Sequence, residues 1–369
     1  MFFQSLDKKE LAELVRTVDI RARERLAGAR SRQLFKWFYR KGVTDFEAMS
    51  DVSKELRAWL HQNAPPYSIR EKNRQTSGDG TIKFLWELDD GNTVESVIIP
   101  AGEPGDEEDA DSGGAGRVTA CISSQAGCAM NCAFCNTGHA GFERNLEVHE
   151  IIGQVLAMQR AAENAVPITN IVFMGMGEPL LNLENIIKAC DILLDGDGLN
   201  FSRRKVTVST CGIVPAMAEL GSRCPVSLAV SLNAVTDALR DKLMPVNKKW
   251  NIKSLLAACR KYPLGPKRRI TLEYVLLAGI NDSDDDARML ARLVRGMPVK
   301  INLIRFNAFA GAVLDAVPLQ GPSAGRARKF QEILMSSHIV ATQRASRGAD
   351  ILAACGQLRN SQTSRVISP

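Results

Sequence analysis

The stretch that decides the fold is "CISSQAGCAMNCAFCNTG", residues 121–138. It contains four cysteines: Cys121, Cys128, Cys132 and Cys135. The last three follow the spacing Cys-x3-Cys-x2-Cys, whereas Cys121 lies seven residues before them. A run with strand character, "RVTACISS", leads directly into this loop. The arrangement predicts a loop at the end of a strand that presents three thiols to one site, and a fourth thiol that needs its own explanation.

Strand-like and helix-like runs alternate from Arg117 onward. The strand-like runs are "RVTACISS" (117–124), "ITNIVFMGM" (168–176), "KVTVSTCG" (205–212), "VSLAVSL" (226–232), "RITLEYVLL" (269–277), "VKINLIRFN" (299–307) and "HIVATQR" (338–344). Repeated strand–helix units predict a parallel sheet with helices outside it. Their number fits a complete or partial (β/α) barrel or an open doubly wound sheet. A Rossmann fold is disfavoured, because no Gly-rich dinucleotide fingerprint follows the first strand.

The composition divides the chain into further segments. Helical spacing of apolar residues, as in "KKELAELVRTV", predicts a small helical domain at the N-terminus. Next, "TIKFLWELDDGNTVESVIIP" predicts a β-hairpin that turns at Asp90-Gly91. An acidic, Gly-rich stretch then predicts a surface insertion. The segments are therefore the helical domain (1–75), the hairpin and linker (76–100), the insertion (101–116), the barrel (117–350) and a C-terminal segment that carries Cys355 (351–369).

The bulk composition is that of a globular protein, with 369 residues, 45% of them hydrophobic and 24% charged. No apolar run approaches the roughly 20 residues of a membrane span, and the first residues lack a signal-peptide pattern. We therefore expect a cytoplasmic protein without a membrane partner, whose clustered cysteines are metal ligands or catalysts before they are structural disulfides. The net charge of +6 permits a nucleic-acid partner without requiring one.

Polar residues stand where the predicted strands end. "GMGEP" (175–179) closes one strand, Ser209 closes the next, and Ser231 and Asn233 close the one after. Asn307 closes the strand "VKINLIRFN". Turns and helix caps favour the same residue types. Because the C-terminal ends of parallel strands build the site in such folds, the set as a whole predicts one polar pocket.

Three interpretations of the Cys128–Cys135 loop compete. A structural zinc site would need a fourth ligand, for which His139 is the nearby candidate. Ordinary core thiols are disfavoured by the tight spacing. A 4Fe–4S cluster bound by three cysteines would leave one iron open for a substrate or cofactor, and the spacing favours this interpretation. The remaining cysteines are expected to be small core residues: Cys190, Cys211, Cys224 and Cys259.

Specific stretches carry a family resemblance. "SSQAGCAMNCAFCNTG", "VFMGMGEPLLN", "VTVSTCGIVP", "LAVSLNA" and "RGADILAACGQL" resemble the radical S-adenosylmethionine (radical SAM) dual-specificity RNA methyltransferases of the RlmN/Cfr family, and the RlmN type in particular. The resemblance runs from about Leu34 to Leu358, and the first segment is similar to the family's RNA-binding-like helical domain. It implies an α/β fold with a partial, TIM-like (β/α) barrel.

The resemblance also implies roles for individual residues. Cys128, Cys132 and Cys135 would bind one 4Fe–4S cluster per chain. The residues implied to bind SAM are Gly177, Glu178, Ser209, Ser231, Leu232, Asn233 and Asn307. The residues implied to be catalytic are Cys355 as the methyl-accepting thiol, Cys121 as its disulfide partner and Glu95 as the base.

The implied reaction is methylation of adenine carbon 2, at adenine 2503 of 23S rRNA and also at adenine 37 of tRNAs. It consumes two SAM molecules and passes through methylated Cys355 and a covalent protein–RNA adduct. An external electron donor of the flavodoxin or ferredoxin type is expected, as is a monomer. Two alternatives stay open: methylation of carbon 8 of the same rRNA adenine, as in the Cfr relatives, and a non-catalytic zinc-containing RNA-binding protein.

Overall fold

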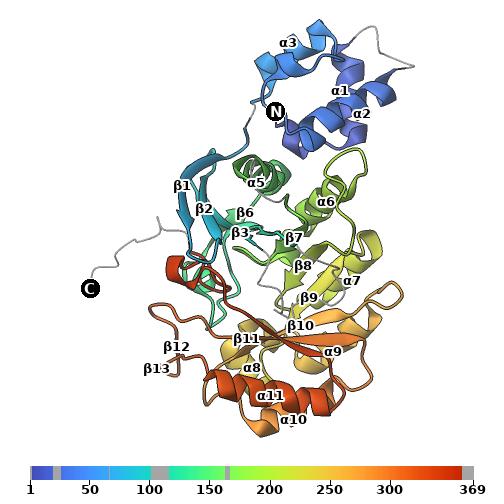
Figure 1. The fold of residues 1–369 in the computed structure, drawn as a ribbon. Helices are drawn as coiled ribbons and strands as arrows, with labels where there is room; N and C mark the ends of the chain where they lie inside the picture. The colour runs from blue at the N-terminus through green and yellow to red at the C-terminus, as the bar shows by residue number, and fades with distance from the viewer. Residues whose placement is uncertain (1, 20–25, 66, 101–115, 163–166, 360–369) are drawn as a thin grey trace.

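A ten-stranded mixed sheet is the framework of the molecule (Figure 1). The computed structural model describes all residues except 1, 20–25, 66, 101–115, 163–166 and 360–369, so the predicted insertion lies outside the described residues apart from Gly116. In spatial order the strands are β1 (Arg70–Thr76), β2 (Ile82–Glu87), β3 (Thr93–Ile99), β4 (Thr119–Cys121), β7 (Asn170–Phe173), β8 (Val206–Thr210), β9 (Ser227–Ser231), β10 (Ile270–Leu276), β11 (Val299–Arg305) and β14 (Ala341–Arg344).

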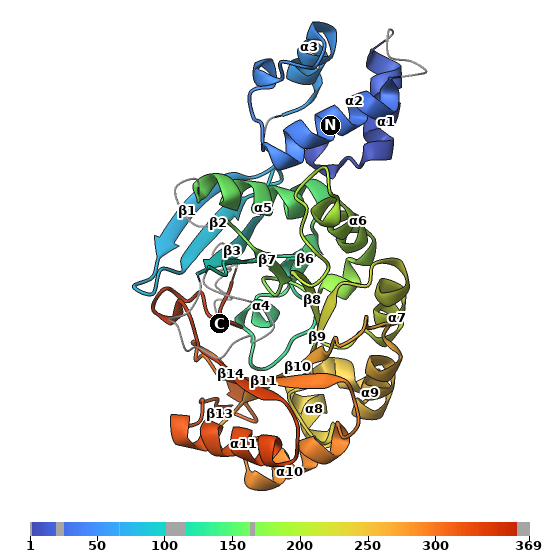
Figure 2. The same cartoon turned by 45° about the vertical axis from the view of Figure 1, so that its right-hand side comes forward.

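The seven strands from β4 to β14 are parallel and coincide with the seven predicted strand-like runs. They curve around a central space, and β14 does not pair with β1, so the sheet closes only part of a barrel (Figure 2). The partial (β/α) barrel is therefore confirmed, and the open doubly wound sheet is not observed.

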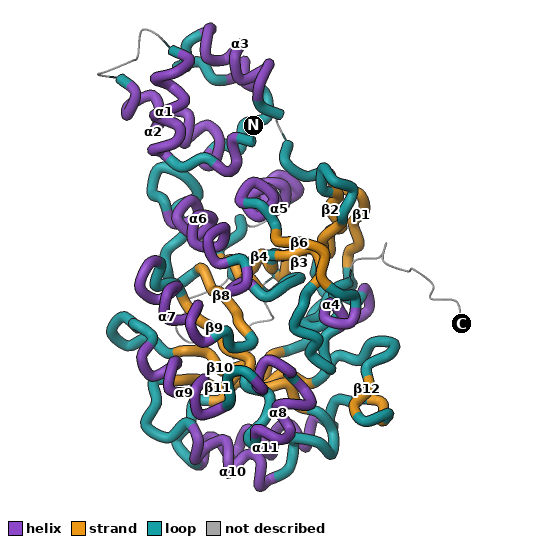
Figure 3. Tube along the Cα trace, turned by 180° about the vertical axis from the view of Figure 1, so that it is seen from behind, coloured by secondary structure: helices purple, strands orange, loops and turns teal. Residues whose placement is uncertain are grey.

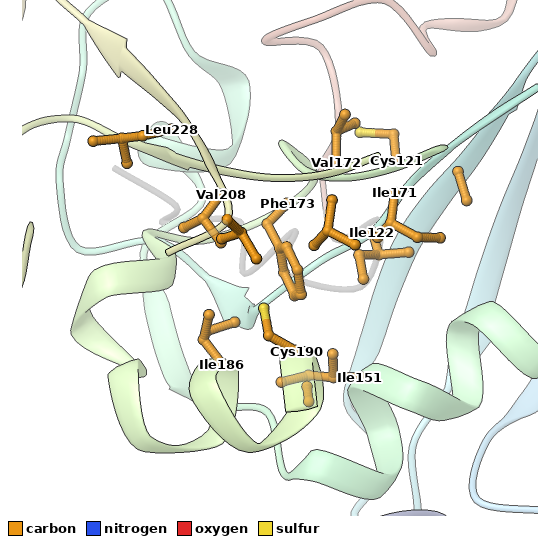
Figure 4. Packing of buried hydrophobic residues seen from close by; sticks show 14 of the residues in the cluster. Cys121, Ile122, Ile151, Ile171, Val172, Phe173, Ile186, Cys190, Val208 and Leu228 are labelled. Atoms are coloured by element: carbon orange, nitrogen blue, oxygen red, sulfur yellow. The ribbon is translucent and has the colours of Figure 1, made fainter. Parts of the chain in front are cut away.

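Helices cover the outer face of this sheet (Figure 2). They are α5 (Val148–Ala161), α6 (Leu183–Leu194), α7 (Val214–Arg223), α8 (Asp237–Leu243), α9 (Ile252–Lys261), α10 (Asp284–Leu293) and α11 (Ala324–Ser336), with the 3-10 turns η5 (Pro179–Leu181) and η6 (Pro245–Lys248). Apolar side chains fill the space between them and the strands. Figure 4 shows Cys190 and Ile186 of α6 beside Phe173 of β7, whereas Cys121 lies with its strand partner Val172.

Antiparallel strands extend the barrel on the β4 side. β2 and β3 form the predicted hairpin, with Gly91 in the left-handed region (φ +82°) that this turn requires. β1 pairs with β2 although its sequence, "REKNRQT", carries no apolar alternation, and the sequence analysis did not predict it. On the other side of the hairpin, Val97 of β3 pairs with Cys121 of β4. Glu95, two residues earlier, therefore lies on the same face of the sheet as Cys121.

The N-terminal helices form a separate layer at one end of the barrel (Figure 1). They are η1 (Phe3–Ser5), α1 (Lys8–Val18), α2 (Ala27–Phe35), the π-helical turn η3 (Lys36–Arg40), η4 (Phe46–Ala48) and α3 (Lys54–Asn63). In their core Phe3 stacks on Phe38, with ring centroids 4.1 Å apart, and Phe46 contacts both rings edge-on. The aromatic residues of this segment are thus largely structural.

Short elements finish the barrel mouth. They are the hairpin β5 (Gln125–Gly127) and β6 (Phe142–Asn145), the one-turn helix α4 (Asn136–His139), the hairpin β12 (Val313–Leu314) and β13 (Val317–Pro318), and the turn η7 (Ala349–Ile351). After β14 the chain returns toward the β1–β2 turn (Figure 2), and the view from behind shows α4 below β1 and β2 (Figure 3). There Asp79 accepts the Gly348 N–H at 2.8 Å, and Asp350 accepts the Ser77 hydroxyl at 2.6 Å. Among the described residues, none of the helices combines the length and apolarity needed to cross a bilayer.

Candidate active site

One pocket lies at the C-terminal ends of the parallel strands, where the sequence analysis placed it. Ten of the predicted site residues line it: Cys121, Cys128, Cys132, Cys135, Gly177, Glu178, Ser209, Ser231, Asn307 and Cys355. They come from β4, from the loops after β4 and β7, from the ends of β8 and β9, from the residues after β11 and from the C-terminal segment. The fold thus brings together residues that are separated by more than half of the chain.

Backbone hydrogen bonds fix the cysteine loop. The Cys128 N–H donates to the Gly141 carbonyl at 2.7 Å, and the Cys135 N–H donates to the Cys132 carbonyl at 3.1 Å. Burial raises the pKa of the Cys128 thiol to about 12 and that of Cys132 well above its ordinary value, and neighbouring thiols add to both shifts. Such thiols stay protonated at neutral pH until a metal centre stabilises their thiolates.

The loop does not provide a zinc site. His139, the candidate fourth ligand, is exposed and lies edge-on to Phe309, with ring centroids 5.4 Å apart, instead of lining the pocket. Within the described ranges, no three His, Cys, Asp or Glu side chains converge closely enough to hold a single metal ion. Cys128, Cys132 and Cys135 all line one pocket, which fits a 4Fe–4S cluster, because each thiolate of such a cluster binds a different iron.

The "GMGEP" loop places Gly177 and Glu178 beside the cysteines. Gly177 adopts φ +99°, and a Cβ at this position would lie 2.5 Å from the Cβ of Gln125, so a side chain cannot be accommodated without movement. Glu178 is buried, and its carboxylate accepts the N–H groups of Leu180 at 3.0 Å and Cys211 at 2.7 Å. Burial raises the pKa of Glu178, while these hydrogen bonds oppose the rise. The carboxylate is therefore held rigidly at the pocket wall.

The remaining predicted SAM-binding residues fall into two groups. Ser209, Ser231 and Asn307 line the pocket. Leu232 and Asn233 are buried behind its wall, where the Asn233 side chain accepts the Val275 N–H at 2.8 Å and approaches the Met244 sulfur at 3.3 Å. Their hydrogen-bonding groups are largely used within the protein, and their role in SAM binding stays a prediction.

Cys121 and Cys355 face the same pocket, and both are free thiols. Cys121 is buried, which raises the pKa of its thiol to about 12, with a further contribution from Cys355. Cys355 is exposed as a residue, while desolvation of its thiol by the surrounding atoms raises the pKa to about 11. The positive charge of Arg344 opposes the rise of the pKa at both thiols. The predicted pair is therefore brought within electrostatic range by the fold.

Hydrogen bonds hold the loop that carries Cys355 against the cysteine loop. The backbone N–H of Asn136 donates to the Gly356 carbonyl at 2.7 Å, and its side chain donates to the Gln357 carbonyl at 3.0 Å. The Thr137 hydroxyl donates to the Leu358 carbonyl at 2.6 Å. Asn136 directly follows Cys135, so the candidate methyl acceptor is attached to the candidate cluster loop.

Glu95 lies next to this pocket rather than in its lining. Its carboxylate forms an ion pair with Lys83 at 3.3 Å and accepts the Arg359 N–H at 2.9 Å. The side chain is buried, which raises the pKa of Glu95, while the nearby Lys83 charge and the Arg359 N–H oppose the rise. A buried carboxylate with a raised pKa is better suited to accept a proton near neutral pH than an exposed one.

Comparisons with known proteins agree with this site. Residues 122–291 match the model of the radical SAM superfamily, and residues 3–65 match that of the ribosomal RNA large subunit methyltransferase N-terminal domain. The dual-specificity RNA methyltransferase RlmN of Geobacter sulfurreducens is 51% identical over 89% of this chain and 86% of its own length. The chain belongs to the RlmN family of radical SAM RNA methyltransferases.

Further relatives and a solved structure support the same assignment. RlmN of Geotalea uraniireducens is 48% identical over 89% of this chain and 90% of its own length. A crystal structure of a radical SAM methyltransferase from Sphaerobacter thermophilus superposes with a TM-score of 0.85, at 41% identity over 97% of this chain and 99% of that one. As a member of the RlmN family, the chain is a SAM-dependent RNA methyltransferase that uses a 4Fe–4S cluster and SAM.

The sequence analysis missed several pocket residues of this RlmN-family site. Cys211, expected in the core together with three other cysteines, is buried but also lines the pocket beside Glu178, whereas Cys190, Cys224 and Cys259 are buried as predicted. Glu273 and Arg344 line the pocket from β10 and β14. A charged residue inside the apolar run "ITLEYVLL" was a usable signal for Glu273, because such residues are seldom buried without a partner.

Proposed function

We propose that this protein methylates carbon 2 of an adenine in 23S rRNA and in tRNAs, with Cys355 as the methyl carrier. The observation that carries the proposal is the single pocket that holds Cys355 and Cys121 together with Cys128, Cys132 and Cys135. The relatives named dual-specificity RNA methyltransferase RlmN support the two classes of RNA substrate. Because both substrates belong to translation, we also propose a cytoplasmic location.

Cys128, Cys132 and Cys135 would hold the cluster, and the open iron would bind SAM. When bound, the cluster supplies the electron that splits SAM into a radical able to remove a hydrogen atom from a methyl group. Gly177 would let the protein backbone approach SAM closely, and the Glu178 carboxylate would complement the ammonium group of SAM. Ser209, Ser231 and Asn307 would supply the remaining polar contacts of the pocket, with Leu232 and Asn233 shaping the wall behind it.

The two thiols outside the cluster set would carry the methyl transfer. Cys355, exposed at the mouth, would accept a methyl group from one SAM and then, through its methylene carbon, bond to the adenine. After the radical adduct gives up one electron to the cluster, Glu95 would remove the ring proton. Cys121 would then attack the Cys355 sulfur, so that a disulfide forms as the bond between sulfur and the methylene carbon breaks, and the released carbon would take up a proton to become the methyl group of the RNA. One SAM would be consumed at each of the two stages. An external flavodoxin- or ferredoxin-type donor would supply electrons to the cluster and reduce the disulfide, and a monomer suffices.

Nucleoside analysis of 23S rRNA and tRNA tests the substrate and the position. After anaerobic incubation with reconstituted enzyme, SAM and a reductant, we expect 2-methyladenosine in both RNAs. Mass spectrometry with authentic standards separates it from 8-methyladenosine, the product of the Cfr-type alternative. Exclusive 8-methyladenosine, or unmodified tRNA alongside modified rRNA, would contradict the corresponding part of the proposal.

Two variants test the route through the thiols. Cys121→Ala keeps the methyl carrier but lacks the resolving thiol, so we expect covalent protein–RNA adducts to accumulate. Cys355→Ala should give neither adduct nor methylated adenine. Methylated adenine produced by Cys355→Ala would refute the covalent route.

A further inference from the structure

Arg240 is a fully buried arginine beneath the pocket. Its guanidinium forms four hydrogen bonds within the described residues, and each goes to an uncharged oxygen. Burying a charge costs free energy, and proteins usually compensate it with an opposite charge in direct contact. The mechanism above gives Arg240 no role, so its burial calls for a reason.

The acceptors of Arg240 lie at two adjacent strand ends. Its guanidinium donates to the carbonyls of Cys211 and Ser231, both at 2.8 Å, and its Nε donates to the Leu232 carbonyl at 2.9 Å. Cys211 follows β8 and Ser231 ends β9, and both residues line the pocket. A planar, rigid fork of donors thus joins the two strand ends that carry Ser209 and Ser231.

The helix that carries Arg240 also contacts the cysteine loop. The carbonyl of Leu243, the last residue of α8, accepts the N–H of Ala133 at 3.0 Å. Ala133 directly follows Cys132. The helix that carries Arg240 is therefore hydrogen-bonded to the loop of a candidate cluster ligand.

Among the described residues, the carboxylates of Asp237 and Asp241 are linked to the guanidinium through Asn247 and not by a direct hydrogen bond. The side-chain oxygen of Asn247 accepts from Arg240 at 3.0 Å, while its amide donates to the Asp241 carboxylate at 2.7 Å and to that of Asp237 at 3.1 Å. Asn247 is therefore interposed between the positive charge and the two acidic side chains. The residues Cys211 and Ser231, whose carbonyls accept from the guanidinium, line the same pocket, where three thiolates would give the bound cluster a net negative charge that grows on reduction.

We propose that Arg240 is a positioning residue that joins the SAM pocket to the cluster loop and balances the negative charge of the cluster. The inference rests on the proposed assignment of Cys132 as a cluster ligand. Two contributions of the Arg240 side chain are distinguished. The charge favours the reduced cluster, and the fork of hydrogen bonds holds the strand ends that bind SAM.

The test compares Arg240→Gln and Arg240→Lys in the anaerobically reconstituted holoenzyme. Iron content and circular dichroism establish that the variants are folded and loaded with the cluster. A redox titration followed by electron paramagnetic resonance gives the cluster potential. Titration of the reduced enzyme with SAM gives the affinity for SAM. We expect Arg240→Gln to shift the potential to more negative values and to weaken SAM binding roughly tenfold or more. Arg240→Lys should keep a near wild-type potential while losing SAM affinity.

Lys242→Gln is the matched control, because it removes a positive charge from the same helix at an exposed position where Lys242 pairs with Asp315. It should leave both the cluster potential and the SAM affinity unchanged.

The charge contribution would be overturned by equal potentials in wild type and loaded Arg240→Gln, or by an equal shift of the potential in Arg240→Lys. The positioning role would be overturned by unchanged SAM affinity in both variants. If Arg240→Gln does not retain the cluster, retention at the wild-type potential in Arg240→Lys supports the inference and loss in both overturns it. A wild-type protein that binds no iron would instead refute the proposed cluster site.

Discussion

Replacing Thr137 by valine should loosen the loop that carries Cys355. The Thr137 hydroxyl donates to the Leu358 carbonyl at 2.6 Å, and both residues are buried. Valine has nearly the same shape but cannot donate, so the substitution removes this hydrogen bond with little change in packing. The loop keeps its other attachments, among them the hydrogen bond from Asn307 to the Cys355 carbonyl at 3.2 Å. We therefore expect the loop to open more often and not to unfold outright.

The size of the effect follows from the carbonyl that is left without its donor. A buried acceptor that loses its partner costs about 1 to 3 kcal/mol. At about 1.36 kcal/mol for each factor of ten, the open population of the loop should rise roughly 5- to 150-fold. The same loss should reduce RNA methylation, because fewer molecules hold Cys355 beside the cluster loop at any time.

Limited trypsin digestion measures this opening directly. Arg347 precedes the Cys355 loop, and cleavage after it requires local opening of the segment that Asp79 and Asp350 anchor to the β1–β2 turn. Under conditions in which closing is fast, the cleavage rate follows the open population. The holoenzyme is digested anaerobically and the fragments are quantified by mass spectrometry.

Thr169→Val is the control for a lost threonine hydrogen bond elsewhere. Thr169 donates to the Val118 carbonyl at 3.1 Å, on the β4–β7 side of the barrel, and does not touch the Cys355 loop. It should leave cleavage after Arg347 at the wild-type rate. Equal cleavage in Thr137→Val and wild type, or equal acceleration in both variants, would refute the idea that this contact holds the loop.

Three further predictions concern the rest of the site. Gly177→Ala should weaken SAM binding about a hundredfold, measured by isothermal titration, because its Cβ would have to move about 1 Å from a neighbouring side chain. Lys83→Met removes the positive charge that keeps the pKa of Glu95 from rising further, so this pKa should increase. Because Glu95 acts as a base only when it is a carboxylate, the acid limb of the pH–rate profile should move to higher pH. His139→Ala should leave the iron content unchanged, measured by elemental analysis, because this side chain is exposed and lies outside the pocket lining.

Each of these predictions has a matched control. Gly28→Ala adds a methyl group where no atom lies within 4 Å and should bind SAM normally. Lys72→Met breaks the exposed ion pair with Glu87 at 3.4 Å and should not move the pH profile. Cys135→Ala should lose iron, in contrast to His139→Ala. Unchanged SAM affinity, an unchanged acid limb or a loss of iron in the histidine variant would contradict the respective arguments.

The barrel could be predicted because its strands are continuous apolar runs that end in polar residues. "ITNIVFMGMGEP" contains both the buried strand β7 and the loop that carries Glu178. The cysteine spacing located the cluster loop in the same way. These signals are local, since a strand, its turn and the residues after it are contiguous in the chain.

Features that depend on distant pairing could not be read from the sequence. β1 has no buried residue, so its strand conformation depends on pairing with β2 and on no pattern of its own. Cys211 stands in an apolar context, and its place at the pocket is evident only once β8 and the Glu178 loop are adjacent. Arg240 likewise resembles any helical arginine until α8 is placed beneath the ends of β8 and β9.

The way the partial barrel is completed explains why Glu95, Cys121 and Cys355 meet. A parallel strand presents its functional residues at its C-terminal end, as Cys121 does on β4. β3 runs antiparallel to β4, so an interior residue of β3 can lie beside that same end, and the Glu95 carbonyl accepts the Ser123 hydroxyl at 2.5 Å. The segment after β14 returns to the β1–β2 turn and brings the Arg359 N–H to the Glu95 carboxylate. The Glu95 carboxylate therefore lies where the strands that precede the barrel meet the segment that follows the barrel. Any movement of the Cys355 loop that withdraws Arg359 also removes a hydrogen bond that keeps the pKa of Glu95 from rising further.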